Sequence, residues 1–299
     1  MSEINSQTSS FKNPDPVDTD SLRFRFHLFI RNKLALVGLL FLLFVSALVA
    51  FGSSLSPYDP LAIDFSVKLN PPSQEHLLGT DNFGRDLMSR IFSGARYTLL
   101  AAFISVLIGL FIGTPLGVLS GYLGRNTDLV LMRIMDILLA FPPLLLAMAI
   151  VSGIGPSLVN ASVAIGASYI PHFARMSRSK AVNIRSMEYV QAAVAVGAPT
   201  ARILFSHVFP NCLTPIIVQA TVYTGYGILW VAGLSFIGLG AKVPTPEWGL
   251  MIAEGRQYII SGEWWVTIFP GLFIMLGVTG FTLIGDGLRE VLNPKLRVY

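Results

Sequence analysis

The sequence has few charged residues for its length. Only 13% of its 299 residues are Asp, Glu, Lys or Arg, whereas 53% are apolar. A soluble globular domain has about 25% charged residues, so much of the surface of this chain must face lipid rather than water. The formal charge of +4 is small and spread along the chain, which argues against nucleic acid as a partner.

Cysteine is nearly absent as well. The single Cys212 excludes an intramolecular disulfide and a cysteine-based metal cluster. No two histidines stand at the i,i+4 spacing of a metal-binding helix; they are His27, His76, His172 and His207. We therefore expect no metal site in this chain.

Nucleotide-binding and catalytic motifs are missing too. No segment matches the phosphate loop G-x-x-x-x-G-K-[ST], because Gly238–Lys242 lacks both its spacing and its Ser or Thr. The run Gly233–Gly238 misses the nucleophile elbow by one residue. We predict no catalytic residue and no cofactor here, and if ATP powers this protein, another chain must bind it.

Long apolar runs dominate the chain instead. A helix needs about 20 mainly apolar residues to cross the hydrocarbon core of a membrane. Six runs approach that length, at about 34–51, 98–122, 129–154, 157–174, 213–239 and 264–284. The first could be a signal peptide, but its length and the long leader before it favour an uncleaved span.

These runs predict an all-α membrane protein with six transmembrane helices in one domain, residues 34–290. The loops 52–97 and 240–263 are expected on one side of the membrane, and the loop 175–212 on the other. Lys and Arg are concentrated on the side that holds both termini and the loop 175–212. The positive-inside rule therefore predicts that this side is cytoplasmic.

The two ends of the chain are polar. Residues 1–21 have the composition of a disordered tail, and residues 291–299 are expected to form a second tail. Residues 22–33 interleave aromatic and basic side chains. This pattern fits either an amphipathic helix in the membrane interface or a simple basic flank of the first span.

A moderately polar insertion after the fourth predicted span has the pattern of two short helices. Ser186 is a suitable N-cap, and Glu188 places a negative charge in the first turn. Gly197 is expected to end the first helix, Pro199 to begin the second and Pro210 to close it. A helix pair hung between two membrane spans is typical of a docking surface.

Two features lie within the predicted spans. In the second half of the second span, glycine recurs at every fourth position, at Gly109, Gly113, Gly117 and Gly121. Such a stripe lets another helix approach closely, and that helix can belong to this chain or to a partner subunit. Arg133 and Asp136 lie three residues apart near the start of the third span, so they can form a structural pair or part of a gate.

The insertion also carries a family resemblance. The run Glu188-Tyr-Val-Gln-Ala-Ala-Val-Ala-Val-Gly197, followed by His207-Val-Phe-Pro210, resembles the EAA motif of bacterial ABC-importer permeases. Gln191 stands where the family usually has Glu. The residues matched to this ATPase-coupling motif are Glu188, Tyr189, Gln191, Ala192, Ala193, Gly197 and Pro210.

Three further segments, 78–90, 234–249 and 285–295, resemble the C-type permease subunit of the dipeptide, oligopeptide and nickel group. The signature residues of the predicted external loops are Gly79, Thr80, Asp81, Gly84, Arg85, Asp86, Glu247, Trp248 and Gly249. These residues either brace the mouth of the permease and its partner or contact an external binding protein.

The resemblance implies a type I ABC-importer permease fold in a bacterial inner membrane, with the EAA helix coupled to an ATPase. It implies as partners a second homologous permease, two cytoplasmic ATPases that hold ATP and Mg, an external solute-binding protein and membrane lipid. The implied activity is import of dipeptides, oligopeptides or a related solute by alternating access. Nickel chelates and glutathione are alternative cargoes, and a membrane enzyme or a non-transporting scaffold are the competing classes.

Overall fold

The computed structural model describes residues 33–292. The predicted tail 1–21, nearly all of the segment 22–33 and most of the tail 291–299 lie outside the described residues. Within the described range the chain is helical and has no strand. The α-helices are α2 (Lys33–Leu55), α3 (Leu87–Leu123), α4 (Arg125–Leu139), α5 (Pro143–Ile154), α6 (Leu158–Arg185), α7 (Glu188–Ala195), α8 (Thr200–Ile203), α9 (Phe209–Phe236), α10 (Trp248–Gly255) and α11 (Trp265–Leu292). Short elements are the 3-10 helices η1 (Phe65–Val67) and η3 (Arg256–Tyr258) and the π-helical turn η2 (Leu204–Val208).

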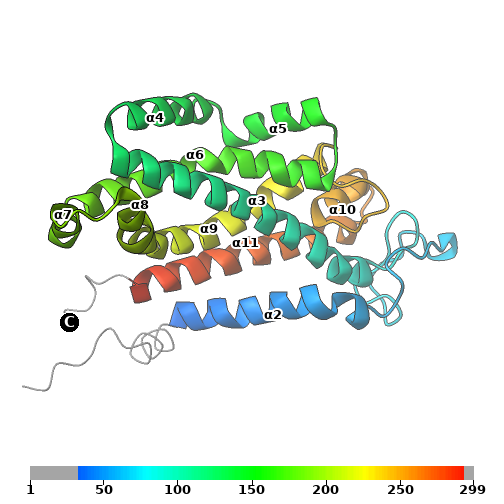
Figure 1. Cartoon of the computed structure of the whole chain (residues 1–299). Helices are drawn as coiled ribbons and strands as arrows, with labels where there is room; N and C mark the ends of the chain where they lie inside the picture. The colour runs from blue at the N-terminus through cyan, green and yellow to red at the C-terminus, as the bar shows by residue number, and fades with distance from the viewer. Residues whose placement is uncertain (1–32, 293–299) are drawn as a thin grey trace, which may run out of the picture.

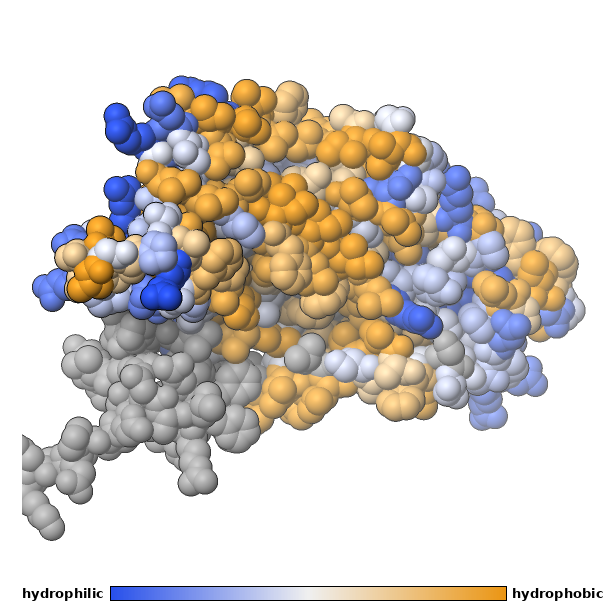
Figure 2. All heavy atoms as spheres, viewed as in Figure 1, coloured by the Kyte–Doolittle hydropathy of each residue, from blue (hydrophilic) through white to orange (hydrophobic). Residues whose placement is uncertain are grey.

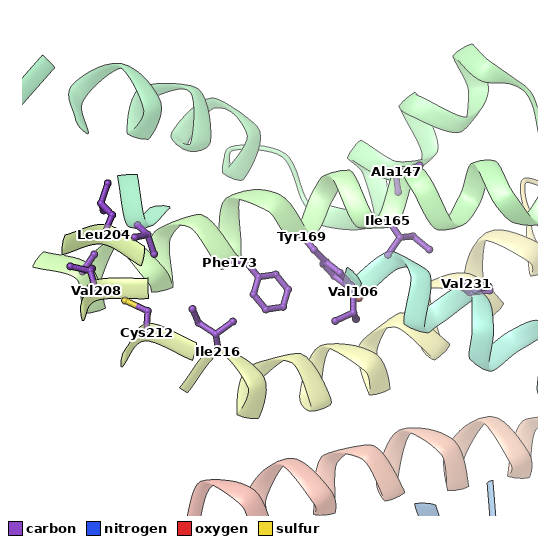
Figure 3. Close-up of a cluster of buried hydrophobic side chains, with 14 of the residues drawn as sticks. Val106, Ala147, Ile165, Tyr169, Phe173, Leu204, Val208, Cys212, Ile216 and Val231 are labelled. Atoms are coloured by element: carbon purple, nitrogen blue, oxygen red, sulfur yellow. The ribbon is translucent and has the colours of Figure 1, made fainter. Parts of the chain in front are cut away.

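The long helices run roughly along one axis, with α7 near one end of the bundle and α10 near the other (Figure 1). We call these the α7 end and the α10 end. α3 packs against α6, α9 and α2, and α11 packs against α9 and α2. One buried cluster fills the space between α3, α6 and α9, where Tyr169, Phe173 and Ile216 lie between the helices (Figure 3). A second surrounds Trp248, between α2, α3, α10 and α11.

Among the described residues, three helices are long and apolar enough to cross a membrane: α3, the continuous stretch Thr200–Phe236 and α11. The pair α4 and α5 passes the same test jointly, and α2 contains the shorter apolar stretch Leu36–Gly52. On the face seen in Figure 2, apolar side chains cover the middle of the bundle and polar ones gather toward its ends. A large apolar surface of this kind marks contact with a membrane.

The third predicted span, 129–154, is not one straight helix. α4 ends at Leu139, α5 begins at Pro143, and the two axes differ by 89°. Pro142 and Pro143 explain the break, because neither has an N–H to donate and each ring clashes with the preceding helical turn. The run is therefore a bent pair of helices.

α6 coincides with the fourth predicted span but continues beyond residue 174 to Arg185. It is not among the helices that are apolar enough to cross a membrane alone. Its surroundings explain this, since α6 contacts α3, α4, α5 and α9. A helix covered by other helices needs small and polar side chains at its contacts rather than large lipid-facing ones.

The glycine stripe of α3 faces α6. A Cβ at Gly117 would lie 2.0 Å from the Ala174 carbonyl oxygen, and one at Gly113 would lie 2.4 Å from that of Ile170. Gly109 and Gly121 approach α6 with similar closeness. Backbones pack here at a distance that excludes any side chain. The helix that the stripe receives therefore belongs to this chain.

The loops differ from their predicted bounds at the α10 end. α3 begins at Leu87, where the Asp86 carboxylate accepts a 2.8 Å hydrogen bond from the Ser89 N–H as an N-cap. The predicted loop 52–97 is thus reduced to residues 56–86. The predicted loop 240–263 contains α10 and η3.

Candidate functional site

The helix pair expected from the sequence is present at the α7 end (Figure 1). After α7, Gly197 has a φ of +79°, which lies in the left-handed region that favours glycine. Pro199 caps α8, whose first residue is Thr200, one position later than predicted. The corner between the two helices is therefore made by Gly197 and Pro199, as the sequence indicates.

Two predicted boundaries of this pair are wrong. Ser186 ends α6, and its hydroxyl donates a 2.8 Å bond to the Asn183 carbonyl instead of capping α7. Pro210 does not close the second helix, which continues into α9. The π-helical turn just before it, in which the Phe209 N–H bonds to the Leu204 carbonyl, accommodates the proline without ending the helix.

The inner and outer faces of the pair differ in chemistry. Val190 and Ile203 are buried in the main core cluster. By contrast, Val196 at the end of α7 is 83% exposed, and Phe205 in η2 is 73% exposed. Met187, Tyr189 and Val194 are also exposed, together with Glu188 and Ala192, while Ala193 is half-buried. Exposed large apolar side chains on an otherwise polar end of a protein mark a site of protein contact.

Gln191 has a structural partner. Its amide donates a 3.3 Å hydrogen bond to the Ser186 carbonyl at the end of α6. A carboxylate at this position, as in the usual EAA motif, could not donate that bond. Tyr189 accepts a 3.3 Å bond from Asn211, and its ring lies 6.1 Å from that of His207. α7 is thus tied to both α6 and the start of α9.

At the α10 end, part of the predicted loop signature forms a buried network of charges. Arg85 donates to Asp81 at 2.6 Å and to the two carboxylate oxygens of Glu254 at 3.1 and 3.2 Å. Arg90 donates to Glu254 at 3.0 Å. Asp81 and both arginines are buried. Because buried charges are tolerated only when paired, the network locks the loop 56–86 to α3 and α10.

Other signature residues shape the same loop. Gly84 has a φ of +73°, and a Cβ there would lie 1.7 Å from a backbone oxygen of the loop. The buried Thr80 accepts a 2.9 Å bond from a backbone N–H. Asp86 pairs with His76 at 2.9 Å in addition to capping α3, and Gly79 lies against the Trp265 ring. The loop is a folded structure rather than an open tether.

Glu247 is fully buried at the start of α10. Its carboxylate accepts hydrogen bonds from the Gly249 and Leu250 N–H groups at 3.0 and 2.8 Å and from the Thr98 hydroxyl at 3.2 Å. Desolvation raises the pKa of Glu247, and the hydrogen bonds oppose this effect. The carboxylate therefore joins α10 to α3 with neutral donors alone.

Trp248 and Gly249 complete this contact. The Trp248 Nε1–H donates a 2.9 Å bond to the Ile91 carbonyl of α3. A Cβ at Gly249 would lie 2.3 Å from the Ala232 carbonyl of α9. Both residues therefore pack α10 against other helices of the same chain.

Two ion pairs hold α4 to α6. Asp128 accepts a 2.6 Å bond from Arg178, and Asp136 pairs with Arg175. Within the described part of the chain, Asp136 forms no ion pair with Arg133, although the sequence predicted one. The Arg133 side chain is exposed. The reason is tertiary, since an arginine of the neighbouring helix reaches the Asp136 carboxylate.

Two family models match the sequence. The model described as "Binding-protein-dependent transport system inner membrane component" matches residues 113–298, and that of the "N-terminal TM domain of oligopeptide transport permease C" matches residues 25–72. The chain belongs to this family of inner-membrane permeases. The permease is a multi-pass membrane protein of a transport system, and the prediction that it is not an enzyme is confirmed by its family.

Several curated relatives resemble the permease over most of their length. The dipeptide transport system permease protein DppC of Alkalihalophilus pseudofirmus is 48% identical, covering 89% of this chain and 88% of the relative. The di/tripeptide permease protein DppC of Pseudomonas aeruginosa is 45% identical, covering 90% of each chain. The probable D,D-dipeptide permease protein DdpC of Escherichia coli is 44% identical, covering 88% of each. The predicted resemblance to C-type peptide permeases is confirmed.

A solved structure has a similar fold. The permease is similar to a chain of the MetNI methionine ABC transporter in an inward-facing conformation, with a TM-score of 0.56 and 25% identity. The similarity covers 69% of this chain and 97% of that chain. The MetNI chain thus matches two thirds of the permease, and the described helices form an ABC-importer permease fold.

Sequence reasoning missed three groups in the permease. Glu254 joins the signature arginines, but it stands alone in an apolar helix with no motif around it. The partners Arg175 and Arg178 lie on α6 far along the chain from the α4 carboxylates that they bind. Spacing reveals pairs within one helix, whereas these pairs depend on how helices meet.

Proposed function

We propose that the permease imports small peptides, dipeptides foremost, into the bacterial cytoplasm by alternating access. The named cargoes of its relatives, dipeptides and di/tripeptides, support this substrate class. It works with a second homologous permease, two cytoplasmic ATPases that bind ATP and Mg, and an external binding protein that delivers the peptide. Membrane lipid surrounds the complex.

The proposed topology has six crossings, made by α2, α3, the bent pair α4–α5, α6, α9 and α11. α2 and α6 count as crossings because they lie in the same bundle as the three helices that are apolar enough to cross alone. With an even number of crossings both termini lie on one side, which the distribution of Lys and Arg makes cytoplasmic. The α7 end is then cytoplasmic and the α10 end is external.

One observation carries the coupling role of the α7 end. The helix pair is fixed in the core by Val190 and Ile203, while Val196 and, in the following turn η2, Phe205 are exposed. We call Val196 and Phe205 the α7 tip. Exposed apolar side chains on a rigid helix pair fit a groove on another protein, whereas their exposure to water is unfavourable. We infer that this tip seats on an ATPase subunit and transmits its closure to α6 and α9.

The first prediction tests this contact. Val196→Asp places a charge in the proposed apolar interface, so we expect the ATPase subunits to bind the permease pair about tenfold more weakly or worse. ATP-driven peptide uptake into vesicles should fall in parallel, while the permease itself stays folded. Affinity of the purified ATPases for the permease pair in nanodiscs is the measurement.

The matched control is Ile260→Asp, which adds the same charge at a residue that is 95% exposed at the α10 end. This variant should bind the ATPases as the wild type does. Equal binding by the Val196→Asp and wild-type proteins would contradict the coupling role of this tip.

A further inference from the structure

A cavity of about 660 Å³ lies between α6, α9 and the C-terminal end of α4. Small-molecule sites have volumes of about 300–1,000 Å³, so this cavity is large enough for a small ligand. It lies apart from the α7 tip and from the charge network of the α10 end. No motif in the sequence points to it.

Most of the lining comes from α6 and α9, and Leu139 of α4 completes it. α6 supplies Arg175, Met176, Ser179 and Lys180, which recur at the spacing of helical neighbours. α9 supplies Gln219 and Tyr223, four residues apart. Gln219 and Tyr223 are half-buried, whereas Arg175, Ser179 and Lys180 are exposed, so the cavity opens to the surface of the bundle on its polar side.

The charges in the cavity do not balance. Arg175 is paired with Asp136 of α4. Lys180 forms no ion pair within the described range 33–292, although it lines the same cavity. Lys180 therefore presents an exposed ammonium group that no carboxylate of the described residues neutralises, and Ser179 and Gln219 line the same cavity with neutral hydrogen-bonding groups. The complement of this arrangement is a small anion with several acceptor atoms, such as a carboxylate.

The other part of the cavity is aromatic. The Tyr223 ring lies 4.8 Å from that of Tyr169, 5.2 Å from that of Phe173 and 5.7 Å from that of His172, measured between centroids. Figure 3 shows Tyr169 and Phe173 extending from α6 into the space between α6 and α9. An apolar or aromatic side chain of a ligand could pack on these rings.

The distance between the two parts fits a short peptide. His172 and Lys180 are eight positions apart on α6, which corresponds to about 12 Å along the helix axis. Two or three extended residues span about 7–10 Å. A dipeptide or tripeptide can therefore place its carboxylate at Lys180 and a side chain at the aromatic rings.

We propose that this cavity is a transit site for small peptides, in which Lys180 binds the free α-carboxylate and Tyr223 and Met176 contact a side chain. The proposal rests on the proposed import of peptides and adds what the membrane subunit itself recognises. The uncompensated cation provides selectivity for a peptide with a free C-terminus.

Substrate protection of a thiol tests the proposal. The natural Cys212 is changed to Ser, and Ser179→Cys places one reactive thiol in the cavity of the assembled complex in vesicles. The probes are the dipeptide Ala-Phe and its C-terminal amide. Ala-Phe should slow labelling of the thiol by a charged thiol reagent, and the amide, which lacks the carboxylate, should not. Gln219→Cys provides a second thiol position if Ser179→Cys fails to assemble.

Charge variants sharpen the test. Lys180→Gln should raise the Ala-Phe concentration needed for protection about tenfold, whereas Lys180→Arg should restore protection. Arg125→Gln removes an exposed cation near the same end of the bundle but outside the cavity, and it should leave protection unchanged. Equal protection by the two peptides, or protection that ignores Lys180→Gln, overturns the proposal.

Further results distinguish lipid binding in the cavity, failure of the transit site and failure of the proposed peptide import. If labelling changes with the content of phosphatidylglycerol in the vesicles and not with peptide, the cavity holds a lipid phosphate and the proposal is wrong. If the complex takes up Ala-Phe with no protection of either thiol, peptide import stands and only the transit site fails. If the wild-type complex takes up no peptide at all, the proposed function itself fails.

Discussion

The Glu247 carboxylate shows how one residue can link helices without an opposite charge. It is completely buried, and it accepts hydrogen bonds from two backbone N–H groups and the Thr98 hydroxyl. Loss of water raises the pKa of Glu247 above the ordinary value of 4.5. The folded protein therefore holds the proton on this carboxyl at pH values where the unfolded chain releases it.

The sign of the resulting pH dependence follows from this shift. A carboxyl whose folded pKa is raised stabilises the fold fully below its unfolded pKa, and that contribution is lost as the pH rises through the folded pKa. We predict that the unfolding temperature of the wild type falls relative to that of Glu247→Gln as the pH rises from about 4.5 toward neutrality. Parallel curves for the two proteins would rule this out, and Glu75→Gln, at an exposed loop carboxylate, is the control that should follow the wild type.

The packing of α3 on α6 shows what decides the bundle at the scale of elements. Four glycines let the two backbones touch, and polar or small residues of α6 fill the remaining space. The contact sets the position of α6, and with it the face that α6 presents to the cavity and to α4. Close helix contact in a membrane depends on shape, because lipid is as apolar as the helices themselves.

Gly117→Ala should destabilise the permease. The added Cβ would lie 2.0 Å from the Ala174 carbonyl oxygen, so the helices must separate, and overpacking of this kind costs about 1–3 kcal/mol. Gly153→Ala is the matched control, since nothing lies within 4 Å of its Cβ position in α5. It should stabilise its helix by up to about 1 kcal/mol. Thermal unfolding of the two purified variants should therefore move in opposite directions from the wild type.

The whole molecule has two unlike ends. The α10 end is braced by buried charges and by folded loops, whereas the α7 end exposes an apolar tip. This asymmetry suits a subunit that keeps one mouth rigid and receives force at the other. A movement of α7 would be transmitted directly to α6 and α9, because Val190 of α7 packs in the same core cluster as both helices.

The proposed topology makes a whole-molecule prediction. In a Cys212→Ser background, Lys68→Cys and Ile260→Cys should react with a membrane-impermeant thiol reagent in intact cells with a permeable outer layer. Asn126→Cys, which is exposed at the start of α4 near the opposite end of the bundle, should react only after the inner membrane is opened. Reaction of Asn126→Cys from outside, or protection of Ile260→Cys, would show a different number of crossings.

Local chemistry was enough to predict much of this protein. The apolar runs placed α3, α9 and α11, and the turn residues Gly197 and Pro199 placed the corner after α7. The same reasoning put the start of α3 eleven residues too late, at 98 rather than at Leu87. Arg90 was predicted to lie in the loop but lies in α3, and a sequence does not show that Asp81 and Glu254 neutralise Arg85 and Arg90 in the fold.

The sequence alone therefore determined where the long apolar helices lie and which family the chain resembles, because both depend on neighbours along the chain. The tertiary structure decided that Asp136 binds Arg175 instead of Arg133, that the glycine stripe receives α6, and that Lys180 lines a cavity without a counter-charge. These features depend on side chains that are distant in sequence, and only the packing of helices brings them within reach of one another.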